Sequence, residues 1–271
     1  MKHYITLAFL AVLCSSANAA LLLYDGFDYN AGELRQSNTG DAWQRNGTGD
    51  TIAIVNGNLS YPGLPASTGR QLDWGGAGAN SRTQFTQVTT GNIFASFLFK
   101  MDTIAPLTNA TPVGVAGLFN AANENNPNSR VYIRRDATNV NAYNFGILER
   151  GSSIAWSSGQ YTAGNTHLVV FSLDFVAGAT NDTARLWVDP LASTFLAATP
   201  PAAIVTASGG VDATKVDRFR FIQNSAAAGR QFADELRIGT TWADVVVPEP
   251  STYALLLGLG AGLLVVNRRR R

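Results

Sequence analysis

Residues 91–101 read GNIFASFLFKM, and this stretch decides the fold. Two sets of side chains alternate along it, one made of Ile93, Ala95, Phe97, Phe99 and Met101 and the other of Phe94, Ser96, Leu98 and Lys100. Successive side chains of a strand point to opposite faces of a sheet. The alternation therefore predicts a β-strand with one buried face.

The same period of two returns at three later places in the chain. It is found in HLVVFSLDF (167–175), in RLWV (185–188) and in RFRF (218–221), where aromatic and arginine residues alternate. Turn-rich pieces such as GGAGANS, NENNPNS and GATND separate these runs, and no helix-length amphipathic segment or internal repeat lies between the two ends. About a dozen short strands with polar turns predict an all-β, two-sheet antiparallel sandwich.

The composition agrees with a packed domain. The chain has 271 residues, of which 46% are hydrophobic and 14% are charged, so it does not resemble a disordered protein. Without Lys2 and Arg268–Arg271 the 20 basic residues become 15, and without Glu249 the 19 acidic residues become 18. The middle of the chain then has a net charge of 15 − 18 = −3, which disfavours nucleic acid as a partner.

The first residues predict an export signal. Lys2 precedes an apolar stretch from Ile5 to Leu13, and Ala17 and Ala19 then form an A-x-A cleavage pattern. These features are typical of a secretory signal peptide over residues 1–19, handled by the Sec export machinery. The single cysteine of the chain lies inside this segment, so the domain that follows it is expected to have no disulfide.

The last residues predict a membrane anchor. Residues 253–266 are 14 in number and carry no charge. A helix of that length spans about 21 Å, less than a hydrocarbon core of about 30 Å, and bilayer thinning or arginine snorkelling closes the gap. Arg268, Arg269, Arg270 and Arg271 are expected to stay in the cytoplasm, which leaves the domain outside. The alternative is a buried core helix.

The junction before this helix carries a resemblance. Val247, Pro248, Glu249 and Pro250, followed by a short apolar segment and a basic end, resemble the PEP-CTERM sorting signal of Gram-negative bacteria. The resemblance implies that residues 247–271 are recognised by an exosortase, which processes the chain near Pro248–Pro250. It further implies a transient stay at the inner membrane and delivery to the cell surface or the extracellular matrix.

The segment between the two ends resembles the concanavalin A-like jelly roll, in its LamG-like group. LLLYDGFDYNAGEL (21–34), ARLWVDP (184–190) and FADELRIGTTWADV (232–245) are similar to its first, late and last strands, so one domain is expected over residues 20–246. The resemblance implies a structural Ca²⁺ that joins the first and last strands through Asp25, Gly26 and Asp234. If Phe232, Leu236 and Ile238 face inward, alternation places Asp234 inward too, where it must be metal-bound, paired or hydrogen-bonded.

The concanavalin A-like fold that this segment resembles also includes glucanases. The E-x-D-x-x-E pattern of retaining glucanases is absent, and so is a G-x-S-x-G elbow. His167 is the only histidine after the signal segment, so zinc is excluded and His167 is expected to be a strand-edge or core residue. No catalytic residue is predicted.

Carbohydrate binding is the function expected from the fold resemblance. Exposed tryptophans supply flat apolar faces with a polar edge, and the candidates are Trp43, Trp74, Trp156 and Trp187. Amides of residues 123–128 supply further hydrogen bonds, whereas the threonines of residues 83–90 form no regular ladder of the ice-binding kind. We therefore expect an exported, non-catalytic protein for adhesion or association with extracellular polysaccharide. The alternatives are a divergent glycan-active enzyme on the same fold and a purely structural surface module.

Overall fold

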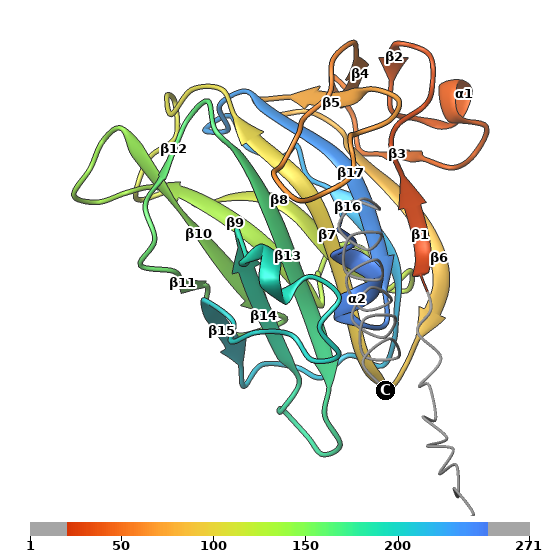
Figure 1. Cartoon of the computed structure of the whole chain (residues 1–271), viewed down its shortest axis with the longest axis vertical. Helices are drawn as coiled ribbons and strands as arrows, with labels where there is room; N and C mark the ends of the chain where they lie inside the picture. Colours follow the sequence, from red (N-terminus) through yellow and green to blue (C-terminus); the bar gives the residue numbers. More distant parts are fainter. Residues whose placement is uncertain (1–20, 249–271) are drawn as a thin grey trace, which may run out of the picture.

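The computed structural model describes residues 21–248 and forms two antiparallel β-sheets packed face to face (Figure 1). Sheet A has nine strands in the order β15 (Val205–Ser208), β14 (Thr183–Val188), β13 (Thr166–Phe175), β7 (Gly91–Met101), β17 (Gln231–Gly239), β5 (Gln71–Trp74), β4 (Ala53–Val55) and β2 (Gly32–Glu33), with β1 (Leu21–Asp25) paired to β17. Sheet B has eight strands in the order β11 (Ala155–Trp156), β10 (Ala142–Glu149), β9 (Ser129–Arg135), β8 (Val113–Phe119), β16 (Val216–Phe221), β6 (Asn80–Val88) and β3 (Gln44–Asn46), with β12 (Tyr161–Thr162) paired to β10. The predicted all-β sandwich is confirmed.

The main core lies between the two sheets. Phe97 and Phe99 of β7 meet Phe219 and Phe221 of β16 and Phe145 of β10 there, and all five side chains have no exposed surface. These rings pack mostly edge to face, with Phe219 and Phe221 only 4.8 Å apart between centroids. Burial of this surface contributes about 25 cal/mol per Å² and is the main stabilising term of the fold.

A second apolar layer covers the outer face of sheet A. Phe94 and Leu98 of β7 and Trp187 of β14 pack there against Trp242 of α2 (Trp242–Val245) and Phe195, which follows the 3₁₀ helix η1 (Ala192–Thr194). Strand β7 is therefore buried on both faces, although its alternation predicts one buried face. The remaining helix, α1 (Gln36–Thr39), is one turn long.

A β-bulge in β17 corrects the predicted orientation of Asp234. The register against β7 shifts between Asp234 and Arg237, and Glu235 at the bulge has φ 52°. Asp234 pairs with Leu98 and so lies on the outer face, whereas Leu236 lies in the main core. The prediction that Phe232 and Asp234 face inward with Leu236 is wrong: Phe232 also lies on the outer face, because the extra residue of a bulge reverses the alternation.

The two terminal segments lie outside the described residues. The predicted signal peptide with Ala17 and Ala19, the predicted transmembrane helix 253–266, the basic end 268–271, and Glu249 and Pro250 of the sorting motif all belong to them. Within residues 21–248, no helix has the length and apolar character needed to cross a membrane.

Candidate functional site

The domain leads directly into the sorting motif. The side chain of Thr241 caps α2 and the carboxylate of Asp244 accepts from the Thr241 backbone N–H at 2.8 Å, which completes a capping box. Val246 is fully buried, and Ser96 Oγ donates to the Val245 carbonyl at 2.6 Å. The residues before the motif are thus fixed to the outer face of sheet A.

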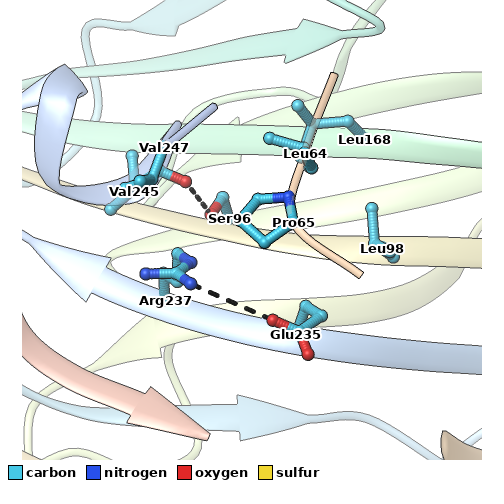
Figure 2. A pocket seen from close by; sticks show the side chains of 9 residues that line it. All are labelled: Leu64, Pro65, Ser96, Leu98, Leu168, Glu235, Arg237, Val245 and Val247. Carbon is cyan, nitrogen blue, oxygen red and sulfur yellow. Dashed lines mark hydrogen bonds and ion pairs between the residues drawn. The ribbon is translucent and has the colours of Figure 1, made fainter. Parts of the chain in front are cut away.

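A small depression borders this junction (Figure 2). Its wall includes Leu64, Pro65 and Val247, and the ion pair between Arg237 and Glu235, 4.0 Å long, lies along one side. Val247, the first residue of the predicted motif, therefore lies against the folded domain.

Three of the four predicted sugar-binding tryptophans are buried, which contradicts their expected role. Trp43 is fully buried and donates through Nε1 to Asp25 Oδ2 at 2.7 Å. Trp74 is 3% exposed and Trp187 is 2% exposed. Trp187 does face away from the main core, as its register predicts, but the second apolar layer covers it. Trp156 of β11 is half-buried and remains available.

Asp25 and Asp234 do not form a shared calcium site. Asp25 points to the main core, where its carboxylate accepts from the Phe27 N–H at 2.7 Å and the Trp43 Nε1–H at 2.7 Å. Asp234 lies on the outer face of sheet A and accepts from the N–H groups of Leu59 and Glu235, both at 2.9 Å. Since the carboxylates lie on opposite faces and already accept protein hydrogen bonds, the pair does not fit one ion. No cluster of three or more metal-ligating side chains occurs within residues 21–248.

The carboxyl group of Asp234 is nevertheless electrostatically unusual. It has no exposed surface, and burial raises its pKa to about 7 in spite of the two backbone donors. The adjacent carboxylate of Glu235 raises this pKa further. Burial disfavours the ionised form because charge is poorly solvated in the interior.

His167 is a core residue, as expected. It is 7% exposed, and its Nδ1 lies 2.6 Å from Asp189 Oδ2, a partner that the sequence did not reveal. The ring packs edge-on against Tyr161 and Phe145, and Nε2 is buried without a hydrogen-bond partner in the described part of the chain. The imidazole of His167 therefore lies between the sheets, whereas the Asp189 side chain is 34% exposed.

The outer face of sheet B carries a row of arginines. Arg82 of β6 pairs in register with Arg220 of β16, Arg220 pairs with Gly117 of β8, and Gly117 pairs with Arg130 of β9. Residues opposite one another in an antiparallel sheet share a face, so the three guanidinium groups lie on the same side. Arg218 adds a fourth cation on the next row of that face.

Aromatic rings lie among these cations. Arg130 lies 4.8 Å from the ring centroid of Tyr132, and Arg220 lies 4.4 Å from that of Phe119. A cation above a ring is attracted by the ring quadrupole. Glycines make room for these groups, because a Cβ added at Gly114 would lie 2.5 Å from Arg130 Nε.

Trp156 and Arg134 extend the same surface across β9, β10 and β11. Arg134 lies 4.2 Å from the Trp156 ring centroid. Gly146 pairs with Trp156, and a Cβ added there would lie 2.7 Å from the ring atom Cε3. The absence of a side chain at Gly146 therefore lets the indole lie close to the sheet.

A cleft with a volume of about 120 Å³ opens at the arginine row. Its lining combines amides, cations and apolar groups: Asn46, Asn80, Phe119, Asn125, Arg130, Arg220, Ile222 and Asn224. We call it the asparagine cleft. At its edge Glu124 forms ion pairs with Arg82 and Arg220, the latter 3.2 Å long, and accepts from Asn46 Nδ2 at 3.0 Å.

The sequence contains a signal for this face. In SRVYIRR (129–135) Arg130, Tyr132 and Arg134 alternate with two core residues, and in VDRFRF (216–221) Arg218 and Arg220 alternate with two core phenylalanines. Alternation of this kind identifies a strand, but it also puts each run of arginines on one solvent-facing side. Asn125, in the amide-rich segment 123–128, does reach the cleft.

Known proteins are similar to this chain in two respects, the sequence of its C-terminal segment and the fold of its domain. Residues 246–271 match the family described as the PEP-CTERM protein-sorting motif, which marks an exported protein sorted by an exosortase. No curated protein matches the chain. The solved T. cruzi calreticulin globular domain is similar in fold, with 13% identity, a TM-score of 0.50, and coverage of 93% of this chain and 100% of that one.

Two enzymes are similar over a smaller part of this chain. The endo-1,3-beta-glucanase from Streptomyces sioyaensis has 11% identity and a TM-score of 0.44, with coverage of 82% of this chain and 96% of its own. The catalytic domain of the glycoside hydrolase family 131 protein from Coprinopsis cinerea has 16% identity and a TM-score of 0.44, with coverage of 81% and 94%. At such identities the likeness concerns the fold alone. The chain thus carries a PEP-CTERM sorting motif next to a concanavalin A-like jelly-roll sandwich.

Proposed function

We propose that this exported, exosortase-sorted protein acts at the cell surface or in the extracellular matrix as a non-catalytic module that binds polysaccharide. The asparagine cleft on the outer face of sheet B is the observation that carries this proposal. Much of the outer face of sheet A is covered by the protein's own second apolar layer. The hollow that remains there, beside Trp187, is lined by Asp174, Arg185 and residues 200–203 and contains one asparagine, Asn92, against the four of the asparagine cleft.

The lining of the cleft suits the chemistry of sugars. An asparagine amide both donates and accepts hydrogen bonds, as a sugar hydroxyl does. Asn125 and Asn224 are exposed at the rim. The accessible lining of the cleft is almost entirely polar, because Phe119 and Ile222 beneath it are each only 2% exposed.

The outer face of sheet B also favours an extended ligand. Tyr132 and Trp156 are half-buried on that face, on strands that continue from the cleft. Aromatic side chains of this kind present a flat apolar body with a polar edge. A chain of sugar units laid across β16, β8, β9 and β11 would meet the cleft first and these rings afterwards.

Binding by the full-length chain in a detergent without a sugar headgroup tests the proposal. We expect the protein to be retained by at least one polysaccharide in affinity electrophoresis, and Asn125→Ala combined with Asn224→Ala to weaken retention. Asn30→Ala, an exposed amide in the β1–β2 connection, is the matched control and should bind like the original chain. Failure of every neutral and charged polysaccharide to retain the folded protein would refute the proposed function.

A further inference from the structure

The arginines on the outer face of sheet B are arranged in a way that destabilises the pairing of its strands. Arg82 and Arg220 are directly opposite each other on neighbouring strands, and like charges in that relation destabilise the pairing. Adjacent strands are about 4.8 Å apart, so the row from Arg82 to Arg130 spans about 14 Å. A row of cations of this length is suited to an extended partner of opposite charge.

Local carboxylates neutralise this row only in part. Glu124 forms ion pairs with both Arg82 and Arg220. Arg130 forms no ion pair with a carboxylate of residues 21–248, and its Nε is buried without a hydrogen-bond partner there. Two guanidinium groups therefore share a single carboxylate, and the third has none.

Arg220 provides the second observation. Only 7% of its side-chain surface is exposed, and its Nε has no hydrogen-bond partner among the described residues although the side chain lines the cleft. Burial, together with the nearby charges of Arg82 and Arg130, lowers the pKa of this guanidinium to about 10. A buried cation of this kind is stabilised by an anion, which supplies both charge and acceptors.

We infer that the polysaccharide bound by the asparagine cleft is anionic, with carboxylate or sulfate groups that lie against Arg130 and Arg220. This inference rests on the proposed function and specifies its ligand class. The planar guanidinium fork of arginine matches the geometry of a carboxylate or sulfate with two parallel hydrogen bonds. The asparagines would bind the hydroxyls of the same sugar units, and the arginines would select the charged ones.

Matched pairs of polymers test the inference with the full-length chain. Polygalacturonate is compared with its fully methyl-esterified form, and dextran sulfate with dextran, so that each pair differs in charge on one backbone. We expect at least one charged polymer to bind about tenfold or more tightly than its neutral counterpart. We also expect this difference to shrink as sodium chloride is raised, because salt screens exposed charge.

Substitutions test whether the outer face of sheet B is the surface that binds the charged polymer. Arg130→Gln should weaken binding of the charged polymer by about tenfold to a hundredfold, the range expected for losing a hydrogen bond between charged groups. Arg130→Lys should give an intermediate loss, since it keeps the charge and removes the fork. Arg230→Gln removes one charge from an arginine that directly precedes β17 and whose side chain is 56% exposed, and it should bind like the original chain. Far-ultraviolet circular dichroism checks that each variant is folded, and if Arg130→Gln unfolds, Arg82→Gln replaces it.

The outcomes separate this inference from the proposed function. Equal binding of charged and neutral polymers, sensitive to Asn125→Ala and insensitive to Arg130→Gln, would overturn the anionic ligand and leave polysaccharide binding intact. Absence of binding to every polymer would overturn both. Duplex DNA bound as tightly as the charged polymers, with the same dependence on Arg130, would overturn the assignment to a polysaccharide.

Discussion

The buried carboxyl of Asp234 predicts an unusual dependence of stability on pH. Its pKa of about 7 exceeds the value of about 3.9 for an exposed aspartate by about three units. The native state therefore holds this proton more tightly than the unfolded state does. The stabilising contribution is complete below about pH 4 and is lost as the pH rises to about 7, which corresponds to about 4 kcal/mol at most.

Substitution of Asp234 by Asn isolates this contribution, because an amide of the same shape cannot ionise. The amide can accept from only one of the two N–H groups, of Leu59 and Glu235, that the carboxylate serves. A buried donor without its acceptor costs about 1–3 kcal/mol at every pH. We therefore expect Asp234→Asn to be less stable than the original protein near pH 4 and more stable near pH 8, by about 1–3 kcal/mol in each case.

Guanidinium unfolding followed by tryptophan fluorescence, repeated from pH 4 to pH 8, measures the difference. Glu149→Gln provides an independent second test of the same reasoning. Glu149 is 1% exposed, burial raises its pKa to about 7 as well, and it lies in β10 of the other sheet. Its effect should resemble that of Asp234→Asn, and the two effects should add because the sites share no contact. Parallel curves for the original protein and Asp234→Asn across this range would refute the electrostatic reasoning.

Three further predictions concern the junction, the metal and the binding face. Ser96→Ala leaves the Val245 carbonyl without its 2.6 Å donor, so the free energy of unfolding should fall by about 1–3 kcal/mol, as measured by calorimetry. Because Asp25 and Asp234 do not share a cation, the melting temperature should be the same with Ca²⁺ and with a chelator, and a rise of several degrees with Ca²⁺ would contradict the described geometry. Gly146→Val should displace the Trp156 indole, which lies within 2.7 Å of the added Cβ position, and should shift tryptophan fluorescence and weaken polysaccharide binding.

The strands were predictable because alternation is a local property of the chain. GNIFASFLFKM identifies β7 and both sets of side chains on it. Its second set is buried by α2 and by residues near Phe195, and nothing within residues 91–101 shows that distant segments will cover Phe94 and Leu98. For the same reason, the prediction that Trp187 faces away from the main core was correct, and the prediction that it is exposed was wrong.

The bulge and the arginine row escaped prediction for different reasons. FADELRIG alternates equally well with or without an extra residue at Glu235, so the sequence does not reveal that Asp234 changes face. The row depends on strand order: Arg82, Arg220 and Arg130 come from positions far apart in the chain and meet only because β6, β16, β8 and β9 are neighbours. Spacing along the chain contains no information about such neighbours.

The two faces of the sandwich suggest how anchoring and binding are kept apart. α2 and Val246 lie on the outer face of sheet A, so the chain leaves the domain on that side (Figure 1). The asparagine cleft lies on the outer face of sheet B, with the main core between the two. If the asparagine cleft binds polysaccharide as proposed, the folded domain itself separates the binding face from Val247, the residue at which the sorting motif begins. If a ligand bound on the sheet A side instead, it would lie in the hollow beside Trp187, lined by Asp174, Arg185 and residues 200–203, because the second apolar layer occupies the region around Phe94 and Leu98.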